Sequence, residues 1–493
     1  MPRTAVPLND APNSAVTILD QPVTKGTCAF VRLLALRSTS FRSALGAGGT
    51  PAVPVNDARG QKDARMVYRV CYTLKGDEFK TRTTNFEQRD EFRKAQMIQP
   101  ANRIEHYYYA IRQVARVAES LTRAGREVIY LNIGDPQVYG FRPPQHIVEP
   151  VAKALREKFT GYSHSAGLRH AREAVAAYAT RLGCPTEVDD VIVTSGASEA
   201  ADLLLTALLD EGDEVLVPAP GYPIYPAILS KLGAIARYYP LDDANGWLPS
   251  VEQVASLINQ KTRALVLINP NNPTGSITPD ECTKQLLELA IKNNILVVAD
   301  EVYRELCFST PPTTASRFAN EMGLPLVTLE SLSKTHLVPG WRTGWMRFTN
   351  AAKMANLIQA VYRLAGGRLC APTPGQYAIR PALEGSREFQ SRFLQQLKTR
   401  RDFAVRKVRD IESLSCDTPQ AAFYLMIKTA DLDGRTDEQF VIDLLQETGV
   451  LVVHGSGFGT DPNKGYFRMV YLADVATLET VFDRLNAFVY ERA

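Results

Sequence analysis

The stretch SLSKTHLVPGWRTGWM, residues 331–346, places one lysine, Lys334, directly after the strand-like start PLVTLESLS. An amine at the buried end of a strand has a lowered pKa and becomes nucleophilic, because burial disfavours the ammonium charge. A lysine on the protein surface is the ordinary alternative for this residue type. Lys334 is therefore a candidate catalytic residue. Which of the two interpretations holds depends on the residues that end the neighbouring strands.

Further short apolar runs flank this lysine on both sides. They are DVIVTSG (190–196), DEVLVPAP (213–220), RALVLINP (263–270), ILVVADEVY (295–303) and GWRTGWMRF (340–348). Helical patterns separate most of them, and a longer amphipathic helix is predicted over residues 102–125, ended by Gly125. Buried strands joined by helices predict an α/β fold with a mainly parallel sheet covered on both faces. Ligands bind such sheets beyond the carboxyl ends of the strands.

Composition excludes several classes of function. The chain has 493 residues, 45% hydrophobic and 22% charged, which is typical of a folded globular protein of two lobes or more. Its net charge of +3, from 56 basic and 53 acidic side chains, provides no single-sign field for nucleic acid. The apolar runs stop well short of the ~18 residues of a membrane helix. The 7 cysteines form no metal-binding pattern, so we expect reduced thiols, no metal site and a cytoplasmic location.

The first 96 residues differ from the rest of the chain. Pro, Gly, Ser and Thr are scattered through them without periodicity, which predicts a flexible N-terminal extension. Within it, residues 28–46 (CAFVRLLALRSTSFRSALG) carry three arginines and no acid. That composition is similar to an organelle transit peptide, so an organelle is the alternative location. The regular pattern starts at Met97, where the compact part of the chain is expected to begin.

Polar residues end several of the predicted strands. Asp300 ends ILVVAD and Tyr303 follows three residues later; a carboxylate at that depth needs a cation, although an aspartate that caps a helix is the alternative. INPNNPTG (268–275) presents asparagine amides, including Asn272, as donors. TSGASEAA (194–201) is a strand, a glycine turn and a helix start, a pattern that favours an anion or merely a serine cap.

Two arginines complete the set. Ser331 and Arg342 could add a hydroxyl and a fixed charge to the anion site, and Arg468, flanked by aromatic residues, could bind a carboxylate or pair with an acid. Pyridoxal phosphate requires such a combination: an amine for its aldehyde, a carboxylate for its ring nitrogen, donors for its phenolic oxygen and a helix N-terminus with Arg and Ser for its phosphate.

These motifs also resemble those of a known family, the class I pyridoxal-phosphate aminotransferases of fold type I. The matching motifs, in the family's order, are NIGDPQ, GYSHSAGLRHAREAVAAY, TSGASEA, PAPGYPIY, NPNNPTG, ADEVY, SLSKTHLVPGWRTGW and FRM. The resemblance implies a mainly parallel seven-stranded sheet flanked by helices, with a smaller α+β lobe built from the N- and C-terminal segments. It further implies an N-terminal arm and part of the small domain over residues 97–145, a large cofactor-binding domain over 146–385 and a C-terminal small domain over 386–493.

By the same resemblance, Lys334 joins the cofactor covalently and moves the substrate proton. Asp300 holds the ring nitrogen, Tyr303 and Asn272 bind the phenolic oxygen, and Tyr222 stacks on the ring. The phosphate is held by Gly196, Ala197, Ser198, Ser331 and Arg342, with Tyr162 of the partner subunit. Arg468 binds the substrate carboxylate, and Gly134 and Asn272 lie beside the substrate. A homodimer with shared active sites follows.

Within the family, the chain is most similar to the bacterial and archaeal alanine (glutamate–pyruvate) aminotransferases. Arg142 and Arg368 are possible partners for a second substrate carboxylate, and KTHLVPG departs from the Tyr-Arg expected after Lys-Thr. The alternatives are an aminotransferase for aspartate, aromatic or other amino acids, a lyase of the same fold, and a DNA-binding regulator with an aminotransferase-like domain. The last is disfavoured because residues 1–96 show no helix-turn-helix pattern.

Overall fold

The predicted mainly parallel sheet is present in the computed structural model, which describes residues 98, 100–104, 107 and 109–490. Its strands lie in the order β2 (Val191–Thr194), β9 (Gly344–Thr349), β8 (Leu326–Ser331), β7 (Leu296–Asp300), β6 (Thr262–Ile268), β3 (Glu214–Ala219), β4 (Ile235–Asp242) and β5 (Leu248–Pro249). β8, β7, β6, β3 and β4 are parallel to one another, β9 is antiparallel to both β8 and β2, and β5 is antiparallel to β4. The seven strands expected are therefore present, and the two-residue β5 adds an eighth at one edge.

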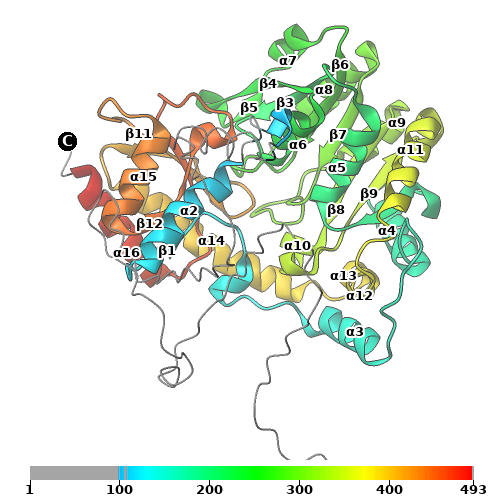
Figure 1. Ribbon diagram of the computed structural model, residues 1–493, viewed down its shortest axis with the longest axis horizontal. Helices are drawn as coiled ribbons and strands as arrows, with labels where there is room; N and C mark the ends of the chain where they lie inside the picture. The colour runs from blue at the N-terminus through cyan, green and yellow to red at the C-terminus, as the bar shows by residue number, and fades with distance from the viewer. Residues whose placement is uncertain (1–97, 99, 105–106, 108, 491–493) are drawn as a thin grey trace, which may run out of the picture. The chain divides into compact units, whose positions relative to one another are not determined.

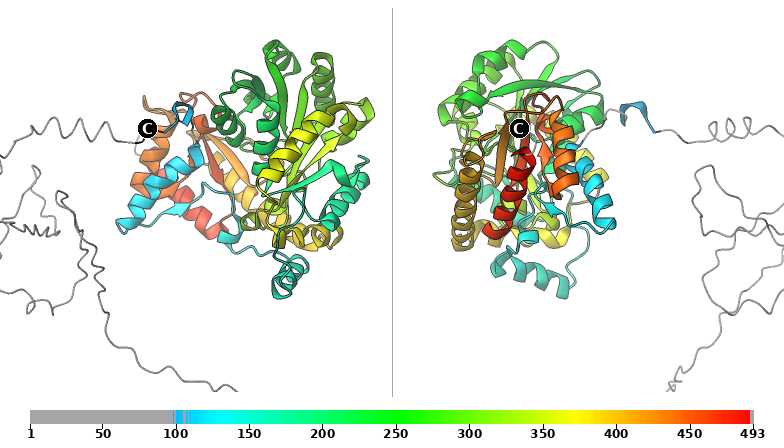
Figure 2. Two further views of the ribbon diagram at one scale, coloured as in Figure 1. Left: turned by 45° about the vertical axis from the view of Figure 1, so that its right-hand side comes forward. Right: turned by 90° about the vertical axis from the view of Figure 1, so that its left-hand side faces the viewer.

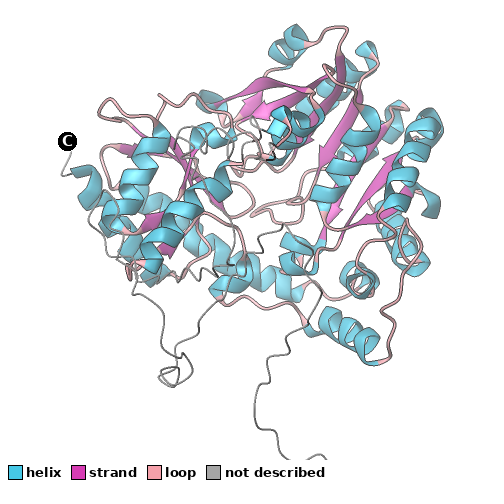
Figure 3. Cartoon of the chain, viewed as in Figure 1, coloured by secondary structure: helices cyan, strands magenta, loops and turns pink. Residues whose placement is uncertain are grey.

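Alternating side chains explain why helices cover both faces of this sheet (Figure 1 and Figure 3). Val215, Val217, Val298 and their equivalents pack against α5 (Ala197–Leu208), α6 (Ile224–Leu232) and α11 (Ala355–Gly367). The intervening residues, such as Leu216 and Val297, pack against α7 (Val251–Leu257), α8 (Asp280–Asn293) and α9 (Ala315–Met322). Successive strand side chains point to opposite sides of the sheet. Because successive residues are apolar here, both faces are apolar and both are covered by helices.

A further helical group covers the β2 end of the sheet. It comprises α3 (Gln145–Arg156), α4 (Arg169–Arg181), α12 (Thr373–Gln376) and α13 (Ile379–Glu384). Val191, Val193 and Trp345 of the sheet share a buried cluster with this group. The short helices are α10 (Leu332–Thr335) and the 3-10 turns η1 (Asn102–Ile104), η2 (Pro136–Tyr139), η3 (Val188–Asp190), η4 (Asp243–Asn245), η5 (Pro339–Trp341), η6 (Ala351–Met354) and η7 (Gly455–Phe458).

The smaller lobe combines both ends of the described chain. An antiparallel sheet runs β10 (Leu414–Ser415), β11 (Tyr424–Thr429), β14 (Tyr466–Val470) and β13 (Val453–His454), and β1 (Ile129–Tyr130) pairs in parallel with β12 (Val450–Leu451). The helices are α2 (Ala110–Arg123), α14 (Glu388–Arg409), α15 (Asp437–Thr448) and α16 (Val475–Tyr490). Figure 1 and Figure 2 show α2 beside α15, although the two come from opposite ends of the sequence. One apolar core joins them, as predicted for this lobe.

Two predicted elements differ from the structure. The predicted helix over 102–125 is described as η1 and then α2, which begins only at Ala110 because Tyr109 has non-helical torsions (φ −137°, ψ 86°). Gly125 follows the helix end with φ +83°, as predicted. β4 was not among the apolar runs, since most of its side chains are at least partly exposed.

Several predictions concern residues or boundaries that the structure does not test. The extension over residues 1–96 and the transit-peptide-like stretch within it lie outside the described residues, and the proposed domain boundaries remain predictions. None of the helices in the described part of the chain is long and apolar enough to cross a membrane.

Candidate active site

A cavity of about 490 Å³ lies where the carboxyl ends of the parallel strands meet the smaller lobe. Tyr424 on β11 and Arg468 on β14 close it from the smaller lobe, and Tyr109 lines it from the start of α2. Eleven residues predicted from the sequence line this cavity: Gly134, Ala197, Ser198, Tyr222, Asn272, Asp300, Tyr303, Ser331, Lys334, Arg342 and Arg468. The fold therefore brings together residues that are separated by more than half of the chain.

Lys334 is the third residue of α10, the short helix that follows β8. Its Nζ donates a hydrogen bond to the Gly134 carbonyl oxygen at 2.5 Å and lies 5.7 Å from the centre of the Phe423 ring. Burial lowers the pKa of Lys334 to about 8, and the positive charges of Arg468 and Arg342 act in the same direction, against Asp135. At that pKa roughly a tenth of the amine is neutral at pH 7, far more than for an exposed lysine.

Asp300 ends β7 on the face that α5 and α6 cover. The Tyr225 hydroxyl of α6 donates to Asp300 Oδ2 at 2.8 Å, and the Val302 amide donates to Oδ1 at 3.3 Å. Burial raises the pKa of Asp300 to about 6, although both hydrogen bonds act in the opposite direction. Among the described side chains, no lysine, arginine or histidine forms an ion pair with it. Such a carboxylate fits a cationic ligand group.

Tyr303 and Asn272 both reach the cavity but are already hydrogen-bonded within the protein. The Tyr303 and Tyr424 hydroxyls lie 2.6 Å apart, and Asn272 Oδ1 accepts from Arg468 Nη1 at 2.9 Å. The amide nitrogen of Asn272 thus remains the donor that could serve a ligand oxygen. These bonds tie the large sheet to the smaller lobe across the cavity.

The start of α5 and Arg342 form a cup for an anion. Gly196 precedes α5 with φ +78°, and a Cβ built there would lie 2.4 Å from Arg342 Nη2. Arg342 is held by the Ser195 and Pro339 carbonyl oxygens at 3.1 and 3.0 Å. The helix N-terminus with the free amides of Ala197 and Ser198 adds a favourable dipole. Glycine at position 196 is therefore required for the close approach of Arg342.

Arg468 is a buried guanidinium that forms no ion pair with an acid among the described residues. Nη2 donates to the Asn132 carbonyl oxygen at 2.6 Å, while Nε is buried without a hydrogen-bond partner among the described residues. Its guanidinium lies 4.4 Å from the Tyr424 ring and 4.5 Å from the Phe458 ring. A planar cation held in this way fits a carboxylate ligand.

Four predicted residues do not line the cavity of this chain. Tyr162 is 83% exposed, so within one chain it does not reach the anion cup. Arg368 forms an ion pair with Glu199 at 3.0 Å, and Arg142 is exposed; neither lines the cavity as a second carboxylate partner. Gly196 shapes the cup only through its contact with Arg342.

The sequence did not single out Tyr225, Tyr109 or Tyr424. Tyr225 lies three residues after Tyr222 in the quoted motif PAPGYPIY, and that spacing on a helix could have indicated a shared face. Tyr109 places its hydroxyl 3.1 Å from that of Tyr222. Tyr424 had no local signal, because its position depends on the second sheet.

The residues fit pyridoxal phosphate. Within the described part of the chain, Asp300 is a buried carboxylate with no cationic partner and Arg468 a buried arginine with no acidic one. Together with the strand-end lysine and the anion cup that excludes a Cβ, each matches one group of the cofactor or of an amino-acid substrate. The fold and the site together define a pyridoxal-phosphate-dependent enzyme of fold type I.

Comparisons with known proteins give the family. The model of the family described as aminotransferase class I and II matches residues 126–485. The chain is 35% identical to the glutamate–pyruvate aminotransferase AlaA of Haemophilus influenzae, over 79% of this chain and 97% of that protein. It is 36% identical to an alanine aminotransferase of Mycobacterium tuberculosis, over 78% of this chain and 91% of that protein. A solved alanine aminotransferase structure from Pyrococcus furiosus matches with a TM-score of 0.77 and 35% identity, covering 80% of this chain and 100% of that one.

The chain therefore belongs to the class I and II aminotransferases. It is an aminotransferase enzyme, and pyridoxal phosphate is its cofactor.

Proposed function

We propose that this enzyme transfers the amino group of alanine to 2-oxoglutarate, which yields pyruvate and glutamate in two half-reactions at one site. The names of the relatives support alanine as the donor. Lys334, Arg342 and Arg468 are the cationic residues among the described lining of the cavity. Each has another role in this proposal, so the described lining leaves no cation for an acidic substrate side chain, which favours a small uncharged one. Glutamate is then accommodated without a dedicated second arginine from the described lining.

The observation that carries this proposal is the buried Arg468 beside Lys334. We assign the substrate α-carboxylate to Arg468, whose guanidinium has no acid partner among the described residues. A carboxylate bound there leaves the amino group and Cα of the substrate facing the rest of the cavity, which Lys334 also lines. Orientation of this kind removes much of the entropic barrier of a reaction.

We assign the proton transfer at Cα to Lys334. Its pKa of about 8, lowered by burial, suits a group that must both accept and release a proton near neutral pH. Such general acid–base catalysis contributes roughly 10²- to 10⁴-fold in rate. Pyridoxal phosphate, when bound, supplies the electron-accepting ring that makes the Cα proton acidic.

The remaining residues hold the cofactor in this proposal. Asp300 would keep the ring nitrogen protonated, and pairing with that cation would lower the pKa of its carboxyl again. Tyr222 would cover the ring, and Tyr303 and Asn272 would face its oxygen. The phosphate group is assigned to Gly196, Ala197, Ser198, Ser331 and Arg342.

We further propose a homodimer in which Tyr162 of the partner subunit completes the phosphate site. The exposed position of Tyr162 supports a contact outside its own chain. A cytoplasmic location stays a prediction from composition.

The test combines one variant with a substrate panel. Lys334→Ala is expected to give no measurable multiple turnover with alanine and 2-oxoglutarate and no cofactor trapped by borohydride. Lys292→Ala, at an exposed position of α8, is the matched control and should behave as the wild-type enzyme. Normal turnover by Lys334→Ala would contradict the assignment of the lysine.

The donor panel tests the substrate. We expect kcat/KM for alanine to exceed the values for aspartate and tyrosine by about tenfold or more. A tenfold ratio corresponds to a difference of about 1.4 kcal/mol in transition-state binding between two substrates. A higher value for aspartate or an aromatic donor would replace the proposed specificity. Ammonia or CO₂ release in place of balanced amino transfer would indicate a lyase.

A further inference from the structure

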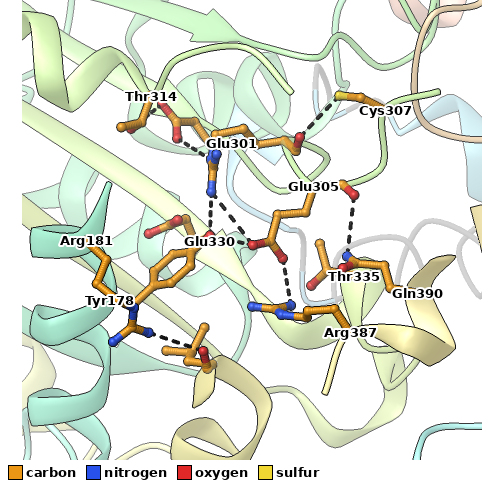
Figure 4. Close-up of polar contacts among 12 residues, drawn as sticks. Tyr178, Arg181, Glu301, Glu305, Cys307, Thr314, Glu330, Thr335, Arg387 and Gln390 are labelled. Carbon is orange, nitrogen blue, oxygen red and sulfur yellow. Dashed lines mark hydrogen bonds and ion pairs between the residues drawn. The ribbon is translucent and has the colours of Figure 1, made fainter. Parts of the chain in front are cut away.

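A cluster of buried and half-buried charged side chains, with one tyrosine, lies next to the strand ends that carry Asp300 and Ser331. Figure 4 shows Glu301, Glu305, Glu330, Tyr178 and Arg387 of this cluster. Its members are Glu301, Arg304 and Glu305 after β7, Glu330 on β8, Arg347 on β9, Tyr178 on α4 and Arg387 before α14. Side chains alternate along a strand, so Asp300 and Ser331 face the cavity while Glu301 and Glu330 face this cluster. The cluster therefore contacts the same strand ends from the opposite side.

Glu305 connects this cluster to the helix that enters the smaller lobe. Its Oε1 accepts from the Tyr178 hydroxyl at 2.7 Å, and its Oε2 pairs with Arg387 Nη1 at 2.9 Å. Figure 4 shows Arg387 and Glu305 facing each other, with Thr335 close by. Arg387 immediately precedes α14, which packs against β10, β11 and α16.

His336 extends the connection to the residue next to Lys334. Its Nε2 lies 3.1 Å from Arg387 Nη1 and 3.0 Å from the Ala382 carbonyl oxygen, and its Nδ1 lies 2.9 Å from Thr335 Oγ1. The hydroxyl of Thr335 is in turn 3.3 Å from the Ser331 carbonyl oxygen.

The ring of His336 is neutral in these contacts. Burial lowers its pKa to about 4, and the neighbouring Arg387 acts in the same direction, against Glu305. With the hydrogen on Nε2, that atom donates to the Ala382 carbonyl oxygen and Nδ1 accepts from the Thr335 hydroxyl. With the hydrogen on Nδ1, Nε2 accepts from Arg387 and Nδ1 donates to Thr335 Oγ1, so that the hydroxyl donates to the Ser331 carbonyl oxygen. In both tautomers Nδ1 shares a hydrogen with Thr335.

The helix that carries Lys334 is too short to be stable by itself. α10 has four residues, and a single helical turn needs outside contacts because nucleation fixes many torsions for one hydrogen bond. Its first turn is held where Ser331 Oγ accepts from the Ser333 amide at 3.3 Å. Thr335 and His336 hold its other end, so Lys334 lies between two fixed points.

We propose that Thr335 and His336 are positioning residues for Lys334, with Arg387 and Glu305 anchoring His336 to α14. The hydrogen bond between Thr335 and His336 sets the orientation of the turn and hence the position of the lysine amine. This inference rests on the role proposed for Lys334. The competing explanation is packing alone, since the His336 ring also lies 5.5 Å from the Phe389 ring.

Four variants separate the hydrogen bond from packing. Thr335→Val removes the hydroxyl and keeps the shape. His336→Asn keeps a polar atom near the position of Nδ1, whereas His336→Gln keeps one near that of Nε2 and loses the contact with Thr335. Thr328→Val on β8 is the matched control, because that buried hydroxyl has no hydrogen-bond partner among the described residues.

The expected result is a loss of turnover without a loss of substrate binding. Thr335→Val and His336→Gln should lower kcat for alanine about ten- to a hundredfold, the range for a small misplacement of a catalytic group, with KM within about twofold because Arg468 is unaffected. His336→Asn should be clearly less impaired than His336→Gln, because it keeps the contact with Thr335 and loses only the contact with Arg387. Thr328→Val should stay near the wild-type values. The double variant with Thr335→Val and His336→Gln should be no slower than the slower single variant, since both remove one interaction.

Two further measurements report on the lysine itself. When pyridoxal phosphate is added to the cofactor-free protein, the absorbance of the lysine-joined cofactor should appear more slowly in Thr335→Val and His336→Gln. The isotope effect with Cα-deuterated alanine should increase in the same variants, because proton transfer becomes more rate-limiting. Circular dichroism and melting temperatures show whether each variant is folded.

Three outcomes would overturn the inference. The first is that Thr335→Val behaves like Thr328→Val in every readout. The second is that His336→Asn and His336→Gln are equally impaired. The third is that the variants melt at lower temperatures while kcat and the isotope effect stay unchanged. A failure of the role proposed for Lys334 is distinguishable from these three outcomes. In that case the Lys334→Ala variant would still show the absorbance of a lysine-joined cofactor.

Discussion

At the scale of single residues, Asp300 and Arg468 are buried ionisable groups that lack an ion-pair partner among the described residues. Burial of an unpaired charge is unfavourable. In the proposed site, a cationic ring nitrogen would compensate the first charge and a substrate carboxylate the second. We therefore expect the cofactor-free protein to be less stable than its packing alone would allow.

Replacement of Asp300 tests this expectation. Burial raises its pKa from 3.8 to about 6, so the folded protein favours the protonated carboxyl, and this group lowers stability above about pH 6 and progressively less as the pH falls towards 4. Asp300→Asn in the cofactor-free protein should raise the free energy of unfolding by roughly 1–3 kcal/mol at pH 7.5, with the gain disappearing near pH 4. Urea unfolding at a series of pH values measures it.

The exposed Asp410→Asn serves as the control and should show no such pH dependence. Asp300→Asn should also lose turnover in the presence of cofactor, because the carboxylate proposed to pair with the ring nitrogen is removed. A destabilised Asp300→Asn protein at pH 7.5 would contradict the assignment of Asp300 as an unpaired buried charge.

At the scale of elements, the junction of β2, α5 and β9 shapes the anion cup. Gly196 lies between β2 and α5, and a Cβ built on Gly344 at the start of β9 would lie 2.7 Å from the Gly196 carbonyl carbon. Two glycines are needed because backbones approach closely here. Arg342 occupies the space that a side chain at position 196 would fill, and the missing side chain at Gly344 lets β9 approach the backbone of Gly196 and Ala197.

Gly196→Ala should weaken cofactor binding by at least about tenfold, since the new Cβ would lie 2.4 Å from Arg342 Nη2 and displace it. The control is Gly212→Ala, which has a similar φ of +82° but nothing within 4 Å of the added Cβ. Both substitutions should destabilise the fold by roughly 1–2 kcal/mol through the positive φ, and only the first should change the dissociation constant. Fluorescence titration of the cofactor-free proteins compares them, and equal dissociation constants would contradict the role of Gly196.

At the scale of the whole molecule, the cavity is formed between the eight-stranded and four-stranded sheets, and its proposed completion needs a second subunit. Mixed dimers can test that need. Lys334→Ala and Tyr162→Ala chains should each be impaired alone, but a mixed dimer has one site with both residues intact. Co-expression should restore roughly a quarter of wild-type activity, because about half of the dimers are mixed and each has one complete site.

Different affinity tags on the two co-expressed chains, followed by purification on both tags in turn, establish that mixed dimers form. Mixed dimers without recovered activity would contradict a role for Tyr162 of the partner subunit.

A chain that begins at Met97 should keep kcat and KM within about twofold of the full-length values, because all of the residues described as lining the cavity lie at Tyr109 or later. Steady-state assays of both proteins with alanine and 2-oxoglutarate provide the comparison. A tenfold loss would assign a part in the site to residues 1–96.

The sequence predicted the strand-end residues well. Lys334 and Asp300 each end or follow an apolar run, and a charge at such a place is visible locally because strands are short and apolar. The pattern also gave the parallel sheet and its helices. It missed β4, whose side chains are mostly exposed, and the late start of α2, where Tyr109 turns towards Tyr222.

The sequence by itself thus determined which residues carry charge and where strands end, since both are local properties of the chain. Only the tertiary structure decided that Tyr225 would donate a hydrogen bond to Asp300 and that the Tyr424 and Tyr303 hydroxyls would share one. The same holds for His336, which forms hydrogen bonds to both Thr335 and Arg387. The physical reason is that these contacts join faces of different elements. Which faces meet depends on how the two sheets and their helices pack together, and no short stretch of sequence contains that information.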